Sequence, residues 1–413
     1  MSSAFAVIAS VSGLVLEAAP LLPSSVCDLI GVYAAAAPAG ELVLAATMAV
    51  PGRLRNLLHP TACAEVRAAF HHACHQGDLR LAQWLAAHFG LTAADVRACD
   101  TAALRWACTA GHLATAQWLA AHFGLTTADA SANDNAALRW ACGNGHLATA
   151  QWLASHFGLT AADARADENF ALQHACENGH LAAAQWLVAR FGLTTADART
   201  GNNFVLRWAC ESGHQKMAQW AAARFGLSAA DARAGDNAAL RKACAGGHLA
   251  TARWLAGHFA LTAADARASG NYALHRAVAN GHLATARWLA SHFNLKVADA
   301  RDNSGAALRW ACESGHRAAA RWLATHFGLT AADARASSNA ALRWACGNGH
   351  LATAQWLAAH FGLTAADARA HDNTALRFAC ARGHLATARW LAAHFGLTAA
   401  DAGEHAAMLG AAH

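Results

Sequence analysis

The chain has 413 residues, of which 55% are hydrophobic and only 14% are charged. A composition this apolar excludes an intrinsically disordered chain. The formal net charge of +5 is small for this length, and no run of Lys and Arg occurs, so the sequence does not favour nucleic acid as a partner. Because much of the apolar fraction is alanine, the sequence predicts closely packed helices.

Residues 1–66 carry no repeat and are predicted to form a short helical N-terminal region. Phe5–Leu16 is apolar but lacks the basic residues that precede the core of a signal peptide. A proline, a glycine and a glutamate interrupt the second apolar stretch, Leu29–Val50, whereas a membrane span needs about 20 apolar residues in succession. We therefore expect no signal, no membrane-spanning segment and no membrane partner.

Residues 20–60 contain a Leu-Pro pair followed by apolar residues at helical spacing: Leu22, Pro23, Val26, Leu29, Ile30, Glu41, Leu42, Leu44, Ala45, Val50, Arg53, Leu54, Leu57 and Leu58. This pattern resembles an F-box, and the resemblance implies that the segment binds the adaptor subunit of a ubiquitin ligase. The alternative is a cap that shields the first repeat, because the ends of a repeat array need a polar outer face. The sequence leaves both interpretations open.

From residue 67 to residue 413 the sequence repeats with a period of 34 residues. A marker glycine recurs in ten copies: Gly77, Gly111, Gly145, Gly179, Gly213, Gly247, Gly281, Gly315, Gly349 and Gly383. A period of this size indicates an array in which each repeat buries its apolar face against its neighbours. The sequence therefore predicts an all-α fold with two parts, a helical region at 1–66 and an α-solenoid of ten repeats at 67–413.

The copy around Gly111 shows the predicted content of one repeat. Asp and Thr residues before Ala102 supply N-cap chemistry for a first helix, which Gly111 ends. A second helix is expected to start near His112 and to stop at Gly124. Apolar residues spaced by three and four predict the buried faces, which are Leu104, Ala107 and Cys108 in the first helix, and Leu113, Ala116, Leu119, Ala120 and Phe123 in the second.

The segment from Ala102 to Leu113, followed by Trp118-Leu119, resembles the ankyrin repeat. It matches the family pattern Thr-Pro-Leu-His-x-Ala-Ala-x-x-Gly-His-Leu at the Leu, first Ala, Gly, His and final Leu positions. Ala-Ala replaces Thr-Pro, and Arg105 stands where the family has histidine. The resemblance covers residues 68–407 and implies a non-enzymatic scaffold that binds protein partners with its concave face and loops.

Thr126 and Asp129 have the spacing of a capping box, in which two side chains satisfy free amides at the start of a helix. The pattern recurs at Thr160/Asp163, Thr194/Asp197, Thr330/Asp333 and Thr364/Asp367. It predicts a short third helical turn in the repeat, where ankyrin repeats have a β-hairpin.

Nine cysteines lie three residues before a marker glycine, and Val278 takes this position in the remaining copy. Valine indicates that the position needs a small apolar side chain. Stacked helices lie about 8–10 Å apart, whereas a disulfide needs Cα atoms within about 7 Å. We therefore expect reduced thiols and a cytoplasmic protein, with the nucleus as the other reducing compartment.

Tryptophan and histidine also recur at fixed positions. Trp118 has an equivalent in all ten copies and His122 in eight. We interpret the tryptophans as packing residues, the marker histidines such as His112 as loop hydrogen-bonding residues, and His122 and its equivalents as cations at helix C-termini. A ladder of tryptophans also suits base stacking, so binding of single-stranded nucleic acid is a distant alternative.

No catalytic or metal-binding pattern emerges from the repeats. His71 and His75 lie four residues apart, a spacing that can hold a metal on one helix face, but no third ligand accompanies them. No nucleophile with a neighbouring base is present, and the recurring aspartates belong to capping boxes. The sequence therefore predicts no enzyme activity, no metal and no cofactor.

The copies differ mainly in the two residues before the marker glycine, at the position of Trp106, and in the loop around Asp134 to Ala136. Large side chains at such positions cluster in the fourth to seventh copies. Because aromatic residues and arginine commonly anchor interfaces, we predict a partner-binding site, with neutral variation among copies as the alternative. Its residues are Phe170, His174, Phe204, Trp208, Lys242, Tyr272 and Arg276.

The predicted function is thus that of a monomeric scaffold for a protein partner. The alternative is a substrate receptor of a ubiquitin ligase, in which residues 20–60 bind the adaptor and the array selects the substrate.

Overall fold

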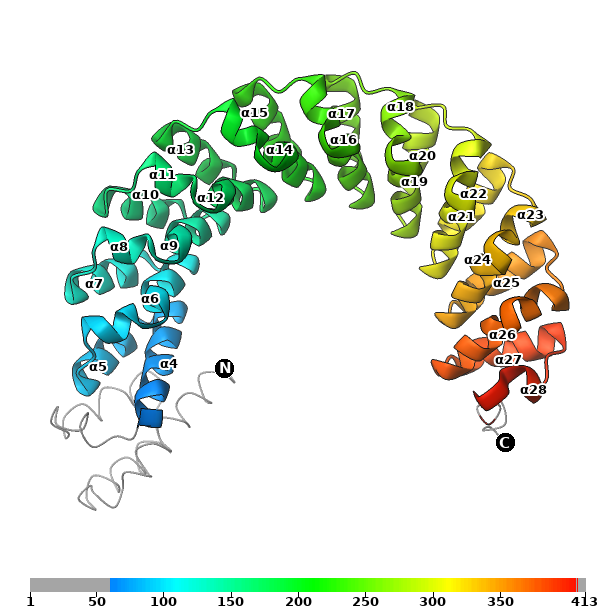
Figure 1. Ribbon diagram of the computed structural model, residues 1–413, viewed down its shortest axis with the longest axis horizontal. Helices are drawn as coiled ribbons and strands as arrows, with labels where there is room; N and C mark the ends of the chain where they lie inside the picture. Colours follow the sequence, from blue (N-terminus) through cyan, green and yellow to red (C-terminus); the bar gives the residue numbers. More distant parts are fainter. Residues whose placement is uncertain (1–59, 406, 408–413) are drawn as a thin grey trace, which may run out of the picture. The chain divides into compact units, whose positions relative to one another are not determined.

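The computed structural model describes residues 60–405 and residue 407. Every regular element in this range is a helix, and no strand occurs in it (Figure 1). The predicted all-α fold is therefore confirmed. Nearly all of the F-box-like segment lies outside the described residues, and the boundary after residue 66 stays a prediction. The first described helix, α4, begins at Pro60.

Two kinds of helix alternate along the chain. The first helices of the repeats are α4 (Pro60–Gln76), α6 (Ala93–Thr109), α9 (Ala132–Gly143), α12 (Ala166–Glu177), α14 (Thr195–Glu211), α16 (Ala229–Ala245), α19 (Ala268–Ala279), α21 (Val297–Glu313), α24 (Ala336–Gly347) and α26 (Ala365–Ala381). The second helices are α5 (Leu79–Phe89), α7 (Leu113–Phe123), α10 (Leu147–His156), α13 (Leu181–Phe191), α15 (Gln215–Phe225), α17 (Leu249–His258), α20 (Leu283–His292), α22 (Arg317–Phe327), α25 (Leu351–Phe361) and α27 (Leu385–Phe395).

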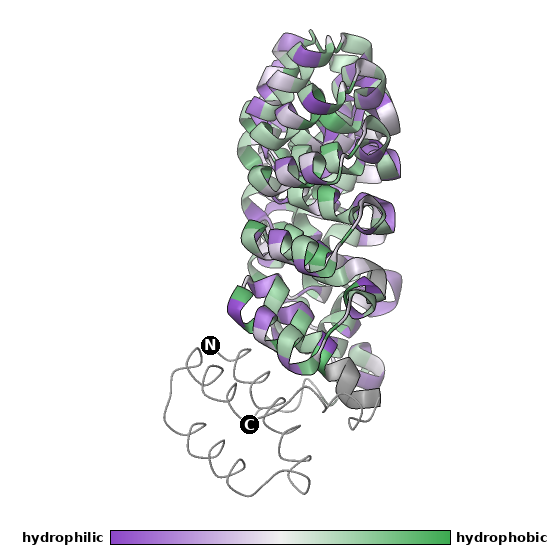
Figure 2. Ribbon diagram, turned by 90° about the vertical axis from the view of Figure 1, so that its left-hand side faces the viewer, coloured by the Kyte–Doolittle hydropathy of each residue, from purple (hydrophilic) through white to green (hydrophobic). Residues whose placement is uncertain are grey.

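The helices form two compact units, of which the first ends at Asp197 and the second begins at Ala198. Within each unit the first helices line one side of the stack and the second helices line the other (Figure 1). Hydrophilic and hydrophobic residues alternate along the helices, as expected for elements that bury one face (Figure 2). Each repeat therefore contributes one row to two different surfaces.

The second helix of the copy around Gly111 largely matches its prediction. Ala116, Leu119, Ala120 and Phe123 are buried in α7, and Gly124 ends the helix with a left-handed φ of 57°. The prediction is wrong for Leu113, which is only half-buried, because Thr115 takes the buried position instead. Threonine fits there because its hydroxyl can bond the preceding repeat, as in Thr251 and Thr353, which donate to the carbonyls of Gly213 and Gly315.

The predicted third helical turn is also confirmed. In five copies it is a separate short helix: α8 (Thr127–Ala130), α11 (Ala161–Ala164), α18 (Ala263–Ala266), α23 (Ala331–Ala334) and α28 (Ala399–Ala402), the last followed by the 3-10 helix η3 (Gly403–His405). In the other copies it runs on into the next first helix. All five predicted pairs form the box; Asp129, for example, accepts hydrogen bonds from the backbone nitrogen and hydroxyl of Thr126 at 2.7 and 2.9 Å.

A left-handed turn joins this short helix to the following first helix. Asn133, Asp134 and Asn135 have φ values of 54°, 53° and 58°, so three successive residues adopt a conformation that most side chains avoid. Thr101, at the repeat position of Asn135, has a φ of 54°, so it does not act as the N-cap predicted before Ala102. Short polar residues and glycine, which tolerate this conformation, fill the turn in the later copies as well.

Arginines of the first helices hold these turns. Arg241 donates from Nε to the carbonyl of Asp236 at 2.7 Å and from Nη2 to the carbonyl of Gly235 at 2.8 Å. Arg343 repeats the arrangement with Ser338 and Ser337. This contact explains why arginine replaces the histidine of the ankyrin pattern, since a long forked donor can reach two carbonyls of the turn.

Candidate functional site

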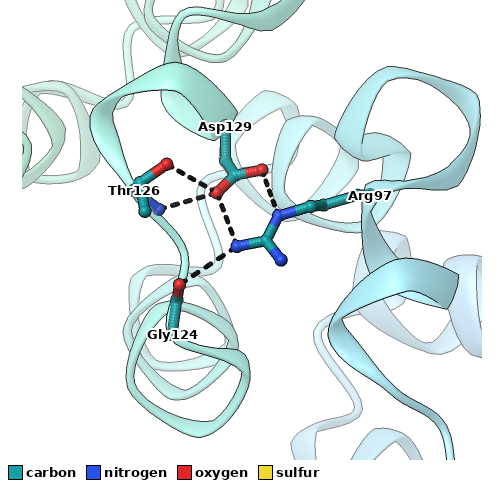
Figure 3. A network of polar contacts seen from close by, with 4 residues as sticks. All are labelled: Arg97, Gly124, Thr126 and Asp129. Carbon is teal, nitrogen blue, oxygen red and sulfur yellow. Dashed lines mark hydrogen bonds and ion pairs between the residues drawn. The ribbon is translucent and has the colours of Figure 1, made fainter.

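An ion-pair ladder connects successive repeats. The Arg97 guanidinium donates from Nε and Nη2 to the two carboxylate oxygens of Asp129 at 2.7 and 3.1 Å (Figure 3). The same Nη2 donates to the carbonyl of Gly124 at 3.2 Å, where the second helix ends. Asp129 therefore caps its own short helix and also fastens the preceding repeat.

The ladder recurs through both units. Its other members are Arg165–Asp197, Arg199–Asp231, Arg233–Asp265, Arg267–Asp299, Arg301–Asp333, Arg335–Asp367 and, with a longer separation, Arg369–Asp401. Ser131 replaces the arginine in one copy and donates to Asp163 at 3.3 Å. The sequence predicted the aspartates but not their arginine partners, although Asp-x-Arg recurs with the repeat period.

The marker histidines lie over the marker glycines of the preceding repeat. A Cβ atom at Gly111, where φ is 77°, would lie within 3.0 Å of the ring of His146. His112 occupies the same place over Gly77, and its Nε2 lies 3.1 Å from the carbonyl oxygen of His75. The prediction of a loop hydrogen-bonding histidine is thereby confirmed for His112.

We expect acid to lower the stability of the array in two stages. Burial lowers the pKa of His146 and His282 in the folded protein. The unfolded chain therefore binds protons at a higher pH than the folded protein, and stability falls as the pH drops below about 6.5. The hydrogen bond from Arg165 lowers the pKa of Asp197 to about 2, and the hydrogen bond from Arg335 lowers the pKa of Asp367 to about 2. Their contribution is present above about pH 4 and is lost between about pH 4 and pH 2. Urea midpoints measured from pH 8 to pH 2.5 test this; a midpoint that stays constant down to pH 4 contradicts the first stage.

The tryptophans of the second helices are half-buried, and each forms a local aromatic cluster. Trp118 stacks on His122 with ring centres 5.2 Å apart and packs edge-on against Phe123 at 5.6 Å. The same cluster recurs in most copies, and Arg190 and Arg224 replace the histidine in the fourth and fifth. These contacts support a packing role, and the cation role of the histidines stays a prediction.

The cysteines behave as core residues. Nine cysteines are free and buried: Cys74, Cys108, Cys142, Cys176, Cys210, Cys244, Cys312, Cys346 and Cys380. Burial raises the pKa of the Cys74 thiol to about 12 and that of Cys108 further. Because the thiolate is the reactive form, these thiols are poor nucleophiles and poor metal ligands.

In the first unit, two predicted partner-binding residues meet on the first helices. The rings of Phe170 and His174 lie 3.9 Å apart, and Trp140 of the preceding repeat lies 5.8 and 5.2 Å from them. The Arg139 guanidinium lies 4.7 Å from the centre of the Phe170 ring and also pairs with Asp167. Burial lowers the pKa of His174, so its ring is largely uncharged at neutral pH.

In the second unit, four predicted residues lie half-exposed on successive first helices. Lys242 of α16 forms an ion pair at 2.7 Å with Glu211 of α14, the helix that also carries the half-exposed Trp208. Tyr272 has the guanidinium groups of Arg241 and Arg276 at 5.1 and 5.9 Å from its ring centre. Aromatic and basic side chains therefore alternate along this face.

The prediction is wrong for Phe204, whose side chain is only 1% exposed. Alanines at the same repeat position, such as Ala102 and Ala136, are also buried, whereas the large side chains of Phe170 and Tyr272 there are half-exposed. Phe204 therefore belongs to the core of the second unit and not to a binding surface.

Sequence reasoning missed the aromatic residues that flank the predicted set. Trp106 is 40% exposed, which makes it the large apolar side chain most open to solvent among the described residues. Trp310, Trp344 and Phe378 occupy the same position later in the array and are half-exposed. Comparison of the copies could have identified these residues, because this position varies from repeat to repeat. We call the residues at this position in the second to tenth copies the first-helix row: Trp106, Trp140, His174, Trp208, Lys242, Arg276, Trp310, Trp344 and Phe378.

Neither a metal site nor a membrane-spanning helix is found among the described residues. No group of three or more His, Cys, Asp or Glu side chains that could hold a metal ion occurs among them, and His71 and His75 acquire no third ligand there. None of the helices between residues 60 and 405 combines the length and the apolar character needed to cross a membrane.

A family model described as ankyrin repeats (3 copies) matches residues 70–165, 121–195, 138–226, 240–335 and 308–402. These matches together span well over half of the 413 residues. No curated protein matches the chain. Ankyrin repeats are protein-interaction scaffolds in general, which agrees with the variable first-helix row on a constant framework. The chain belongs to the ankyrin-repeat family.

Proposed function

We propose that this protein is a non-enzymatic scaffold that binds a protein partner through the first-helix row of its repeats. The observation that carries the proposal is the contrast between positions. Core residues, glycines and the ion-pair ladder recur from copy to copy, whereas the half-exposed first-helix row changes between Trp, His, Lys, Arg and Phe. Variation on a fixed scaffold is how repeat proteins form specific surfaces.

The chemistry of this row suits a protein partner. Trp208, Tyr272 and Arg276 are half-exposed, so each can bury further area on binding. Aromatic residues and arginine commonly supply the largest contributions to interface energy. The first unit has its own candidate cluster, formed by Trp140, Phe170 and His174. The proposal includes a monomeric protein in a reducing, cytoplasmic compartment, which the buried free thiols support.

The test compares three full-length proteins in a quantitative pull-down. We expect Trp208→Ala/Tyr272→Ala/Arg276→Ala to lose the partner at least about tenfold, because hot-spot residues each contribute about 2 kcal/mol or more. The control is Ser155→Ala/Ser291→Ala/Thr325→Ala, which places alanine at an exposed second-helix position where most other copies have it.

Proteins captured equally by the wild type and the control, but lost by the first-helix variant, are the partners. Thermal unfolding of all three proteins shows whether a loss reflects misfolding. The proposal is contradicted if the first-helix variant is folded and captures the same proteins in the same amounts as the wild type.

The finer alternative, a substrate receptor of a ubiquitin ligase, depends on residues 20–60 and on their resemblance to an F-box. Its test is co-purification of the full chain with an F-box adaptor subunit, compared with Leu22→Ala/Pro23→Ala. Binding of single-stranded nucleic acid has less support, because tryptophans such as Trp118 are half-buried and a histidine ring occupies one of their faces.

A further inference from the structure

The second helices of the second unit carry basic residues but no acidic ones. From α15 to α27 they contain Lys, Arg and His, and neither Asp nor Glu. The residue before the recurring tryptophan is either Gln or Arg in all ten copies: Gln83, Gln117, Gln151, Gln185, Gln219, Arg253, Arg287, Arg321, Gln355 and Arg389. Arg253, Arg287 and Arg321 follow one another in three successive repeats, and we call them the arginine stripe.

The three guanidinium groups of the arginine stripe are exposed and have no partner among the described residues. Among the residues that the structure describes, none of them forms a hydrogen bond, an ion pair or a ring contact. Another arginine of each of these repeats has a structural role, because Arg267, for example, pairs with Asp299. The stripe therefore adds positive charge to the surface without stabilising the fold.

The carboxylates that follow these three helices in the chain are already paired. The capping aspartates Asp265, Asp299 and Asp333 are paired with the arginines of the ion-pair ladder. Like charges in adjacent repeats repel one another, and an anionic partner would relieve this repulsion. The charge of the surface thus points to an anionic ligand.

The surroundings of the stripe discriminate among anionic ligands. One helical turn after each arginine stands a small exposed residue, Gly257, Ser291 or Thr325, so the stripe offers no large apolar side chain for insertion into a lipid surface. The neighbouring tryptophans are half-buried, and a histidine ring occupies one face of each with centres 5.1 Å apart, in the pairs Trp254–His258, Trp288–His292 and Trp322–His326, which disfavours stacking of bases.

The spacing of the charges favours a polypeptide. Stacked helices lie about 8–10 Å apart, so the stripe presents one positive charge about every 10 Å. A nucleic-acid strand carries a phosphate about every 3.4 Å of helix axis, which is far denser. An extended polypeptide advances about 3.3 Å per residue, so acidic residues at every third position match the stripe.

We propose that Arg253, Arg287 and Arg321 bind an extended acidic segment of another protein, which crosses the second helices with one carboxylate for each repeat. This site is separate from the first-helix row, because it lies on the other side of the second unit (Figure 1). Arginine suits it, because its planar fork can hold a carboxylate by two parallel hydrogen bonds. The protein thus carries a second interaction surface that is independent of the first-helix row.

The test uses the full-length protein and a fluorescein-labelled peptide, (Glu-Gly-Ser)6, whose carboxylates recur at every third residue. Fluorescence polarisation at low ionic strength is expected to show binding that weakens as salt is added and that is absent for (Gln-Gly-Ser)6. In Arg253→Gln/Arg287→Gln/Arg321→Gln the affinity is expected to fall at least about tenfold. Glutamine stands at this position in six copies, so the variant keeps residues that the fold already accepts.

A matched control removes three charges from other second-helix positions. In Arg190→His/Lys216→Ala/Arg224→His each new residue is one that other copies have at the same position. The affinity of this control is expected to change less than about threefold, because the arginine stripe remains intact. Equal losses in both variants mean that net charge alone matters, and that result overturns the proposal.

The first unit offers a gain-of-function test. Its second helices have glutamine at the equivalent position and no acidic residue, so Gln117→Arg/Gln151→Arg/Gln185→Arg is expected to raise the stoichiometry from one peptide to two. An unchanged stoichiometry in the folded variant, or tighter binding of (dT)20 or of phosphatidylserine vesicles through the arginine stripe, overturns the assignment to an acidic polypeptide.

Discussion

Replacing Phe204 with alanine is expected to lower the free energy of unfolding of the second unit by about 3–5 kcal/mol, because the change leaves a cavity in a closely packed core. Phe204 is only 1% exposed, and it is among the largest fully buried side chains of the protein. Long repeat arrays often unfold in several steps, so hydrogen exchange of amides in α14 and α16 is the suitable measurement.

Two other residues of the same repeat differ from the other copies in ways that offset the size of Phe204. Ala221 occupies a position that is leucine in the other nine copies. Met217 stands where most copies have threonine or alanine. Both are buried, and we infer that Phe204 and Met217 restore the volume that the missing leucine removes.

This inference predicts a rescue. In the double variant Phe204→Ala/Ala221→Leu, the repeat regains the alanine and leucine found together in most other copies, so more than half of the lost stability is expected to return. The control is Tyr272→Ala at the same repeat position as Phe204. Because Tyr272 is half-exposed, its loss is expected to cost about 1 kcal/mol. Equal losses for Phe204→Ala and Tyr272→Ala contradict the buried placement of Phe204.

The repeat architecture could be predicted from the sequence because the same constraints recur in every copy. Leu104, Ala107 and Cys108 were predicted to share a buried face, and all three are inaccessible to solvent. The capping boxes at Thr126/Asp129 and its equivalents follow from two residues three positions apart, so local chemistry was enough to place the third helical turn.

Contacts between repeats were harder to predict, because they join residues about one period apart. The partner of Asp129 is Arg97, which lies 32 residues earlier in the chain. The N-cap chemistry predicted before Ala102 is wrong, because Thr101 has a left-handed φ of 54°, and residues that suit N-caps also fill left-handed turns, as at Asn133–Asn135. Sequence periodicity shows which residues recur, but the stacking of repeats decides what they contact.

The burial of the candidate binding residues also could not be predicted from their position in the repeat. Phe170, Phe204 and Tyr272 occupy one position of the repeat, yet only Phe204 is fully buried. We infer that its burial is linked to the alanine at Ala221, where the other nine copies have leucine. A variable position in a repeat can therefore reflect adjustment of the core as well as selection for binding.

The second large effect is expected at the marker glycines. In Gly111→Ala the new side chain must adopt a left-handed φ, which costs about 1–2 kcal/mol. A Cβ atom would also lie within 3.0 Å of the imidazole of His146, and overpacking of this kind costs about 1–3 kcal/mol more. The total loss is expected to be about 2–5 kcal/mol, measured by hydrogen exchange of the amides in α7 and α9.

Gly124 provides a matched control in the same repeat. It also has a left-handed φ, of 57°, but no atom lies within 4 Å of the position of its Cβ. Gly124→Ala is therefore expected to cost only the backbone term of about 1–2 kcal/mol. If both substitutions cost the same, the ring of His146 does not pack on Gly111.

A double-mutant cycle separates the two terms at Gly111. In a His146→Ala background the ring is absent, so Gly111→Ala is expected to cost no more than Gly124→Ala. His146→Ala by itself is expected to destabilise the junction between the two repeats, because burial of the ring and its contact with the preceding loop are lost. A coupling energy near zero contradicts this arrangement. A coupling of about 1–3 kcal/mol shows instead that the recurring Gly-His pair forms a packing contact between successive repeats, in which the glycine leaves space for the histidine ring of the next copy.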